Sequence, residues 1–172
     1  MVEPVARTYG MDIEKIRTVK AGKKSQVVIA LDSDEHPTLD DLEEVSKELS
    51  TLFDDAEERG EVSFGAGYTL ELTPPGVDLP LTEARHFRRN RGRKVKVGGE
   101  QWRVGPLDAN ETLVALVRAT KKGEEVRISP VSELSGAVVE IEFNAPPATE
   151  SELADRAFEE LEAAAAEGKE HK

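Results

Sequence analysis

The chain has 172 residues, a formal net charge of -12 and no cysteine, which excludes disulfides, thiolate nucleophiles and zinc-thiolate sites. No segment approaches the roughly 18 apolar residues of a membrane span, and the first residues lack a basic-then-apolar secretory pattern. We therefore expect a cytoplasmic protein without a membrane partner. The negative charge argues against indiscriminate binding to nucleic acid, but screening over about 8 Å leaves room for a local basic surface.

Residues 1–81 are predicted to form an α+β domain with two helices on a three-stranded sheet. Residues 2–10 have the pattern of a short helix, and residues 11–19 and 26–31 have the pattern of two strands joined by a polar turn. A bulge near Lys15 would restore the alternation of the first strand. The second strand is apolar on both faces, which predicts a position at the centre of the sheet.

A long helix is expected to cover one face of this sheet. Thr38 precedes it and Asp41 follows three residues later, the spacing of a capping box. The opposite face of the helix is strongly acidic; we interpret it as a solvated face, with a docking surface for a basic partner as the alternative. A third strand is predicted at residues 68–73. The apolar stripe that would face the sheet consists of Leu39, Leu42, Val45, Leu49, Leu52, Phe53 and Ala56.

The loop before this helix contains Asp32, Asp34, Glu35 and His36, residue types that bind divalent metals or act as acid and base. The glycine and the distal glutamate of a calcium loop are not at the required spacing. We therefore interpret the segment as a solvated loop and expect neither a metal nor a cofactor, with a metal site as the alternative.

Residues 74–81 are predicted to be a stiff hinge between two domains. Pro74 and Pro75 end the third strand because they lack backbone amide donors, and Pro80 disfavours helical backbone at Leu79. The residues that define this hinge motif are Pro75, Gly76, Asp78, Pro80 and Leu81.

The basic segment, residues 84–106, contains eight Lys or Arg and one acid, Glu100. It comprises a helix that Thr82 would cap, ending near residue 91, and the strands that follow. Guanidinium groups bind phosphate in bidentate fashion and stack on exposed bases, so the segment is a candidate RNA-binding surface; a solvated charged helix is the alternative. The candidate RNA-binding residues are Arg85, Arg88, Arg89, Arg91, Arg93, Lys94 and Lys96.

Residues 82–146 are predicted to form a small all-β barrel of the SH3-like or Sm-like type, a comparison at the level of the fold only. Five short strands separated by turns follow the basic helix, and closure would remove their exposed sheet edges. Trp102 lies in one of these strands. We interpret it as a core residue, with a contact to a protein partner as the alternative.

Residues 147–172 are predicted to be an acidic, partly helical or mobile tail. Thr149 and Glu152 have the spacing of a capping box, and Leu153, Ala157, Leu161 and Ala164 form an apolar stripe. We interpret the tail as a frayed extension. The alternative is a segment that covers the basic surface until RNA displaces it.

Residues 68–97 contain twelve residues whose order and spacing form a signature: Leu70, Glu71, Leu72, Pro75, Gly76, Asp78, Pro80, Leu81, His86, Phe87, Gly92 and Val95. This signature resembles that of the ribosome maturation factor RimP family. Two positions depart from the usual family pattern: Pro74 stands in place of Ser and Leu79 in place of Arg. If that arginine contacts RNA or protein in the family, this chain lacks the contact.

The resemblance implies a factor for assembly of the small (30S) ribosomal subunit. It implies binding to the free subunit through 16S ribosomal RNA and small-subunit ribosomal protein twelve at the decoding centre, with release before translation. The expected partner is thus the 30S subunit rather than a small-molecule substrate, and a monomer is our default expectation.

Two other function classes are weighed against this one. An enzyme would need a general base, for which His36 and His86 are the candidates, but no nucleophile elbow, phosphate-binding loop or metal spacing accompanies them, so we expect no enzyme. A protein-binding module could hold a basic ribosomal protein through Trp102 and acidic surfaces, without RNA contact. Salt separates this module from an RNA binder, because neutralising about six phosphates predicts a roughly thousandfold loss of affinity between 50 and 200 mM salt.

Overall fold

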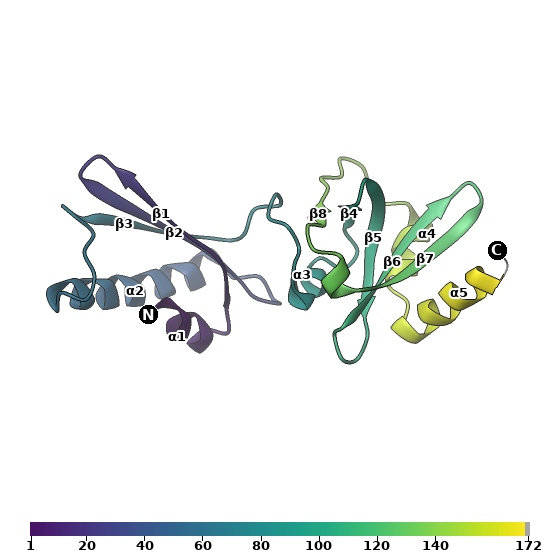
Figure 1. Cartoon of the computed structure of the whole chain (residues 1–172), viewed down its shortest axis with the longest axis horizontal. Helices are drawn as coiled ribbons and strands as arrows, with labels where there is room; N and C mark the ends of the chain where they lie inside the picture. The colour runs from purple at the N-terminus through teal and green to yellow at the C-terminus, as the bar shows by residue number, and fades with distance from the viewer. Residues whose placement is uncertain (171–172) are drawn as a thin grey trace. The chain divides into compact units, whose positions relative to one another are not determined.

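The computed structural model describes residues 1–170, except for the side chain of Glu170, and divides into two compact units, Met1–Gly76 and Val77–Lys172 (Figure 1). Each unit has its own sheet and its own hydrophobic core. Among the described residues, no helix combines the length and the apolarity that crossing a membrane requires.

The first unit is an α+β layer. Its elements are α1 (Val2–Thr8), β1 (Asp12–Ala21), β2 (Lys24–Asp32), α2 (Leu39–Glu58) and β3 (Tyr68–Thr73). The described strands form a sheet of order β1-β2-β3, in which β1 is antiparallel and β3 parallel to β2. Both helices lie on one face of this sheet (Figure 1). The predicted α+β architecture and the central position of β2 are confirmed.

Local sequence signals locate the elements of this unit well. The register of β1 against β2 shifts between Ile13 and Lys15, which confirms the predicted bulge. Thr38 and Asp41 form the predicted capping box at α2, with backbone-to-side-chain distances of 2.9 and 3.1 Å. Most of the apolar stripe of α2 is buried against the sheet, but Leu39 is 83% exposed because the first turn extends beyond the core.

The second unit is built on five antiparallel strands among the described residues. The strands are β4 (Lys94–Val97), β5 (Glu100–Leu107), β6 (Leu113–Thr120), β7 (Gly123–Pro130) and β8 (Val138–Val139), in the order β7-β6-β5-β4-β8. A 3-10 turn, Val131–Glu133, precedes β8. Within the part of the chain described, β7 and β8 are opposite edges of the sheet and do not pair, so no closed barrel is found.

Both faces of this sheet are covered. Helix α3 (Ala84–Arg89) and the turn before β8 pack on one face, where Phe87, Trp102 and Leu116 belong to one buried cluster. Helices α4 (Ala148–Ala154) and α5 (Phe158–Glu170) pack on the other face (Figure 1). The basic segment therefore lies within a packed unit rather than on a separate arm.

The carboxyl-terminal residues do not behave as a single frayed helix. The chain bends between α4 and α5, and Leu153, Phe158 and Leu161 are buried against the sheet. The predicted capping box is wrong: α4 begins at Ala148 with Pro147 as its N-cap and no capping side chain. The described part of the segment is thus a structural layer of the second unit.

Candidate nucleic-acid interface

Helix α3 is fixed to the second unit by its central residues. Phe87 is fully buried in the core beneath the sheet. The Nδ1 atom of His86 accepts hydrogen bonds from the backbone amides of Thr82 and Glu83, each at 3.0 Å, and the Glu83 carboxylate completes the capping box. The predicted helix is thus shorter than expected, and Glu83 rather than Thr82 is its N-cap. His86 therefore caps the start of α3 through its Nδ1 atom.

The arginines of α3 are engaged within the protein. Arg88 forms an ion pair with Glu111 at 2.6 Å, although both side chains are partly exposed. Arg85 and Arg89 are half-buried and also take part in intramolecular interactions. The Arg88 guanidinium is therefore held by Glu111, and a nucleic acid would have to share it with that contact.

Arg91 holds the carboxyl end of helix α4. Its Nε donates to the carbonyl oxygen of Ala154 at 2.9 Å, and its Nη2 donates to that of Arg156 at 3.0 Å. Carbonyl groups at a helix end lack intrahelical partners and carry partial negative charge, which a guanidinium satisfies. This predicted RNA-binding residue is thus a clamp between α4 and the turn after α3.

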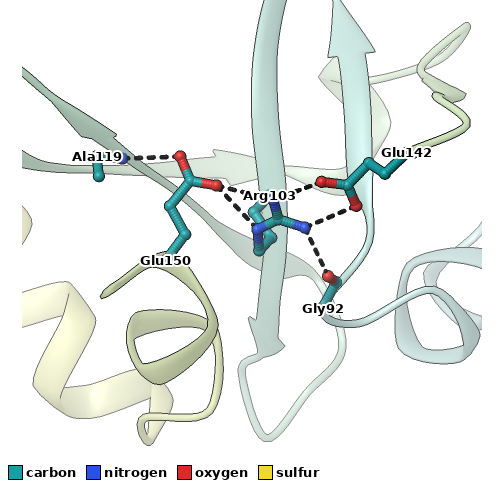
Figure 2. A network of polar contacts seen from close by, with 5 residues as sticks. All are labelled: Gly92, Arg103, Ala119, Glu142 and Glu150. Atoms are coloured by element: carbon teal, nitrogen blue, oxygen red, sulfur yellow. Dashed lines mark hydrogen bonds and ion pairs between the residues drawn. The ribbon is translucent and has the colours of Figure 1, made fainter. Parts of the chain in front are cut away.

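Arg103 is the most deeply buried charge of the basic segment, with 1% of the residue exposed. Figure 2 shows its guanidinium between two carboxylates that come from distant parts of the chain. Nη1 and Nη2 donate to the two oxygens of Glu142 at 3.0 and 2.8 Å, and Nη1 also donates to the Gly92 carbonyl at 3.0 Å. Nε donates to Glu150 at 3.0 Å, and the other oxygen of Glu150 accepts from the Ala119 amide at 3.1 Å.

This network ties three regions of the second unit together. Arg103 is on β5, Glu150 is in α4, and Glu142 lies just after β8. The hydrogen bond with Arg103 lowers the pKa of Glu142, and the positive charges of Arg103 and Lys94 act in the same direction. The same hydrogen bond raises the pKa of Arg103, which keeps the guanidinium charged. Such an arrangement is structural, because both carboxylates satisfy a charge that would otherwise be buried alone.

The remaining basic residues of the segment differ in exposure. Arg93 and Lys96 are exposed to solvent, whereas Lys94 is half-buried on the same face of β4 as Lys96. The sequence count of eight basic residues against one acid overlooks three carboxylates that reach the segment from elsewhere: Glu111, Glu142 and Glu150. The accessible positive charge is therefore centred on Arg93 and Lys96 and is smaller than the sequence suggests.

Trp102 offers little surface to a partner. It is 5% exposed and packs within the core of the second unit. Its Nε1 donates to Glu100 at 3.3 Å, and the guanidinium of Arg118 lies 4.1 Å from the ring centroid. A cation over an indole face is a favourable arrangement, so Arg118 covers one face of the ring.

The predicted hinge motif divides between the two units. Pro75 is half-buried and Gly76 is exposed at the end of the first unit. Asp78 and Pro80 are exposed, whereas Leu81 is 5% exposed and donates its amide to the Ala137 carbonyl at 2.7 Å. Leu81 therefore anchors the chain to the second unit. The stiffness of the residues before it stays a prediction.

The acidic loop of the first unit has a local structural use. Nδ1 of His36 lies 3.2 Å from the Asp32 carboxylate, and the Ser33 amide donates to the same carboxylate oxygen at 2.9 Å. Across residues 1–170, no group of three or more His, Cys, Asp or Glu side chains is placed to hold a metal ion.

Sequence reasoning missed the positive charge of the first unit. The turn at residues 21–24 was interpreted as a polar connection, yet all residues from Lys15 to Lys24 are exposed and five of them are Lys or Arg. A count of charge over a ten-residue window would have found this signal.

Comparison with known proteins extends over both units. A family model described as the RimP N-terminal domain matches residues 1–78. The ribosome maturation factor RimP of Corynebacterium aurimucosum is 47% identical over 166 residues, which cover 92% of this chain and 88% of that protein. The RimP proteins of Corynebacterium diphtheriae and Corynebacterium kroppenstedtii are 49% and 41% identical over 163 and 176 residues, or 92% and 93% of this chain and 88% and 93% of those proteins.

Proposed function

We propose that this chain, which belongs to the RimP family of ribosome maturation factors, assists assembly of the small (30S) ribosomal subunit. In this proposal the protein binds the free subunit through 16S ribosomal RNA and small-subunit ribosomal protein twelve, and leaves before translation begins. It acts as a binding factor and not as an enzyme.

The observation that carries the RNA contact is the exposure of Arg93 and Lys96 beside helix α3. Both cations are held on rigid backbone, because the Arg93 amide donates to Asn90 and its carbonyl accepts from Val104, while Lys96 pairs with Gln101 on β5. A cation presented by a packed element loses little conformational entropy when it meets a phosphate. These residues are therefore the part of the basic segment best suited to RNA.

The fold of the second unit supports the same proposal at a coarser level. Its five antiparallel strands and the short 3-10 turn before the last strand are the features from which we infer a likeness to SH3-like or Sm-like units. The strand pairings do not close, so the likeness to a barrel remains part of the proposal.

A second candidate function is a protein-binding module that holds a basic ribosomal protein without RNA contact. The observation that favours it is a pair of apolar side chains after β8: Ile141 is 65% exposed and Phe143 is 93% exposed. Glu140 precedes them, and Glu142 between them is bound to Arg103, so the segment is chiefly an apolar surface. Exposed apolar side chains of this kind suit a protein partner better than a phosphate backbone.

Co-sedimentation with purified small subunits, large subunits and whole ribosomes tests these candidates. The test variant carries Arg93→Glu and Lys96→Glu. The matched control carries Lys121→Glu and Lys122→Glu, which change the charge equally at an exposed turn of the same unit. Selective binding of the intact chain to free small subunits, lost in the test variant and kept in the control, is the expected result.

Two other outcomes would change the proposal. Binding to none of the three particles would contradict a role in small-subunit assembly. Selective binding that survives Arg93→Glu and Lys96→Glu, changes little between 50 and 200 mM salt and is lost with Phe143→Ser would favour the protein-binding module.

A further inference from the structure

A second basic surface lies in the first unit, where the basic hairpin, residues 15–24, spans most of β1 and the start of β2. It contains Lys15, Arg17, Lys20, Lys23 and Lys24 and no acid, although residues 1–76 contain seventeen acids and only eight basic residues. Every residue of the basic hairpin is exposed. Across the residues that the structure describes, none of the five cations forms an ion pair.

The sheet separates three of these five cations, Lys15, Arg17 and Lys24, from the acids of helix α2. Arg17 is paired with Val28 on β2. Val28 lies on the opposite face of β2 from Ile29, which is buried against the helices, so Arg17 points away from the helices. Lys15 and Lys24 lie on the same open face by the same register. Helix α2 carries nine acids and one lysine on the other side of the sheet (Figure 1).

Three carboxylates share the open face of the sheet by register: Asp12 and Asp32, which pair with each other at the end of β1 and β2 away from the tip, and Glu71. Glu71 on β3 is two strands from Arg17 by register and accepts a hydrogen bond from Gln26 at 3.4 Å. Two strand spacings are roughly 10 Å, which exceeds the screening length of about 8 Å at physiological salt. Glu71 therefore weakens the positive potential of the basic hairpin only slightly.

The tip of the basic hairpin is held in one conformation. Gly22 takes a φ of 66°, which suits the first central position of a tight turn. The Lys23 carbonyl accepts from the Ala66 amide at 3.0 Å, and Ser25 bonds through its amide to Gly67 at 3.0 Å and through its hydroxyl to Phe64 at 3.2 Å. A preformed tip presents its cations without a large loss of conformational entropy on binding.

The composition of the hairpin indicates the class of partner. Four of its five cations are lysines, which are depleted at protein interfaces but bind phosphate as point charges. The segment contains no aromatic residue on which an unpaired base could stack. We propose that the basic hairpin is an RNA contact that binds the phosphate backbone of a double-stranded segment, without reading its sequence.

This contact is separate from the surface of Arg93 and Lys96 and does not depend on the assignment to the small subunit. Its test measures binding of the full chain to a fluorescein-labelled 20-base-pair RNA duplex of arbitrary sequence, by anisotropy at 50, 100 and 200 mM salt. The test variant carries Lys23→Glu and Lys24→Glu. The control carries Lys121→Glu and Lys122→Glu, which make the same charge change in another exposed hairpin turn, where Glu124 and Glu125 follow.

We expect the test variant to bind the duplex about tenfold more weakly at 50 mM salt than the intact chain does. The slope of the logarithm of the binding constant against the logarithm of the salt concentration should also fall by about two in magnitude, because each lost lysine removes one phosphate contact. The control should change the affinity less than twofold. A second variant, Lys15→Glu with Arg17→Glu, changes two cations on the open face of β1 and should lose a similar amount of affinity for the duplex. Far-UV circular dichroism checks that the variants fold.

Two results would overturn the inference. In the first, the intact chain does not bind the duplex at 50 mM salt; if the test variant then also loses binding to small subunits, the basic hairpin contacts an acidic protein partner instead of RNA. In the second, the test and control variants lose affinity for the duplex equally, so that only net charge matters. The proposed function can also survive the failure of this inference. That is the case if the variant with Arg93→Glu and Lys96→Glu loses binding to small subunits, while the variant with Lys23→Glu and Lys24→Glu keeps both small-subunit binding and duplex binding.

Discussion

The basic segment of the second unit and the basic hairpin of the first unit look alike as sequences and differ as surfaces. The basic segment has more cations, but Arg88, Arg91 and Arg103 bind carboxylates or helix carbonyls that come from distant parts of the chain. The basic hairpin has fewer cations, and all of them face solvent. The comparison teaches that the density of positive charge along a sequence does not measure the charge available to a partner.

Replacing Arg103 should have the largest effect on stability. Arg103→Met leaves Glu142 and Glu150 without their cation in a site where the guanidinium is fully buried, so we expect a loss of about 3–5 kcal/mol in the free energy of unfolding. Urea unfolding followed by the fluorescence of Trp102, the one tryptophan of the chain, reports on this unit. The exposed control Lys96→Met should change stability by less than about 0.5 kcal/mol. A loss below about 1 kcal/mol for Arg103→Met would mean that the two carboxylates are well solvated, and the contrast between the two basic regions would fail.

The packing of the carboxyl-terminal helices decides whether Glu150 can reach Arg103. Leu161 is fully buried beneath the sheet, so Leu161→Ala should cost about 2–5 kcal/mol of unfolding free energy through the cavity it leaves. Urea unfolding followed by the fluorescence of Trp102 measures this loss. Ala164→Ser, at an exposed position of the same helix, should cost about 0.5 kcal/mol. Equal stability of the two variants would show that α5 does not pack as described.

The rigid tip of the basic hairpin is tested at Gly65. This glycine has a φ of 72°, and a Cβ atom there would lie 2.8 Å from the Lys23 carbonyl oxygen. Gly65→Ala should therefore cost about 1–3 kcal/mol and accelerate hydrogen exchange at the Ala66 amide, which donates to that oxygen. Gly60→Ala, with a similar φ of 75° and no atom within 4 Å, separates backbone strain from the clash. If both variants leave exchange at Ala66 unchanged, the tip is not held by this contact.

The smallest predicted effect is a dependence of stability on pH. Because the pKa of Glu142 is lowered in the folded state, its contribution is complete above the ordinary value of 4.5 and is lost as the pH falls through the folded-state pKa. The intact chain should therefore lose more stability than Glu142→Gln between pH 6 and pH 3.5, measured by urea unfolding. The exposed control Glu133→Gln should follow the intact chain. Parallel curves for the intact chain and Glu142→Gln would show that Arg103 does not hold this carboxylate.

Local patterns in the sequence determined most elements of the fold. The alternation of apolar residues, the capping box at Thr38 and the bulge before Lys15 each depend on neighbours a few positions away, so they could be predicted. The RimP signature around the hinge led to the family for the same reason, because it is a contiguous stretch. What the sequence left open was the break between α4 and α5, which depends on where Leu153 and Leu161 meet the sheet.

Only the tertiary structure decided which charges are available. Arg103 meets Glu142 and Glu150, which are 39 and 47 positions away, and no window along the sequence brings them together. Lys15, Arg17 and Lys24 of the basic hairpin lie on the side of the sheet away from the acidic helix α2. Charge pairing depends on separations of a few ångströms in space, so the sequence determines how many cations the chain carries and the fold determines which of them can reach a phosphate.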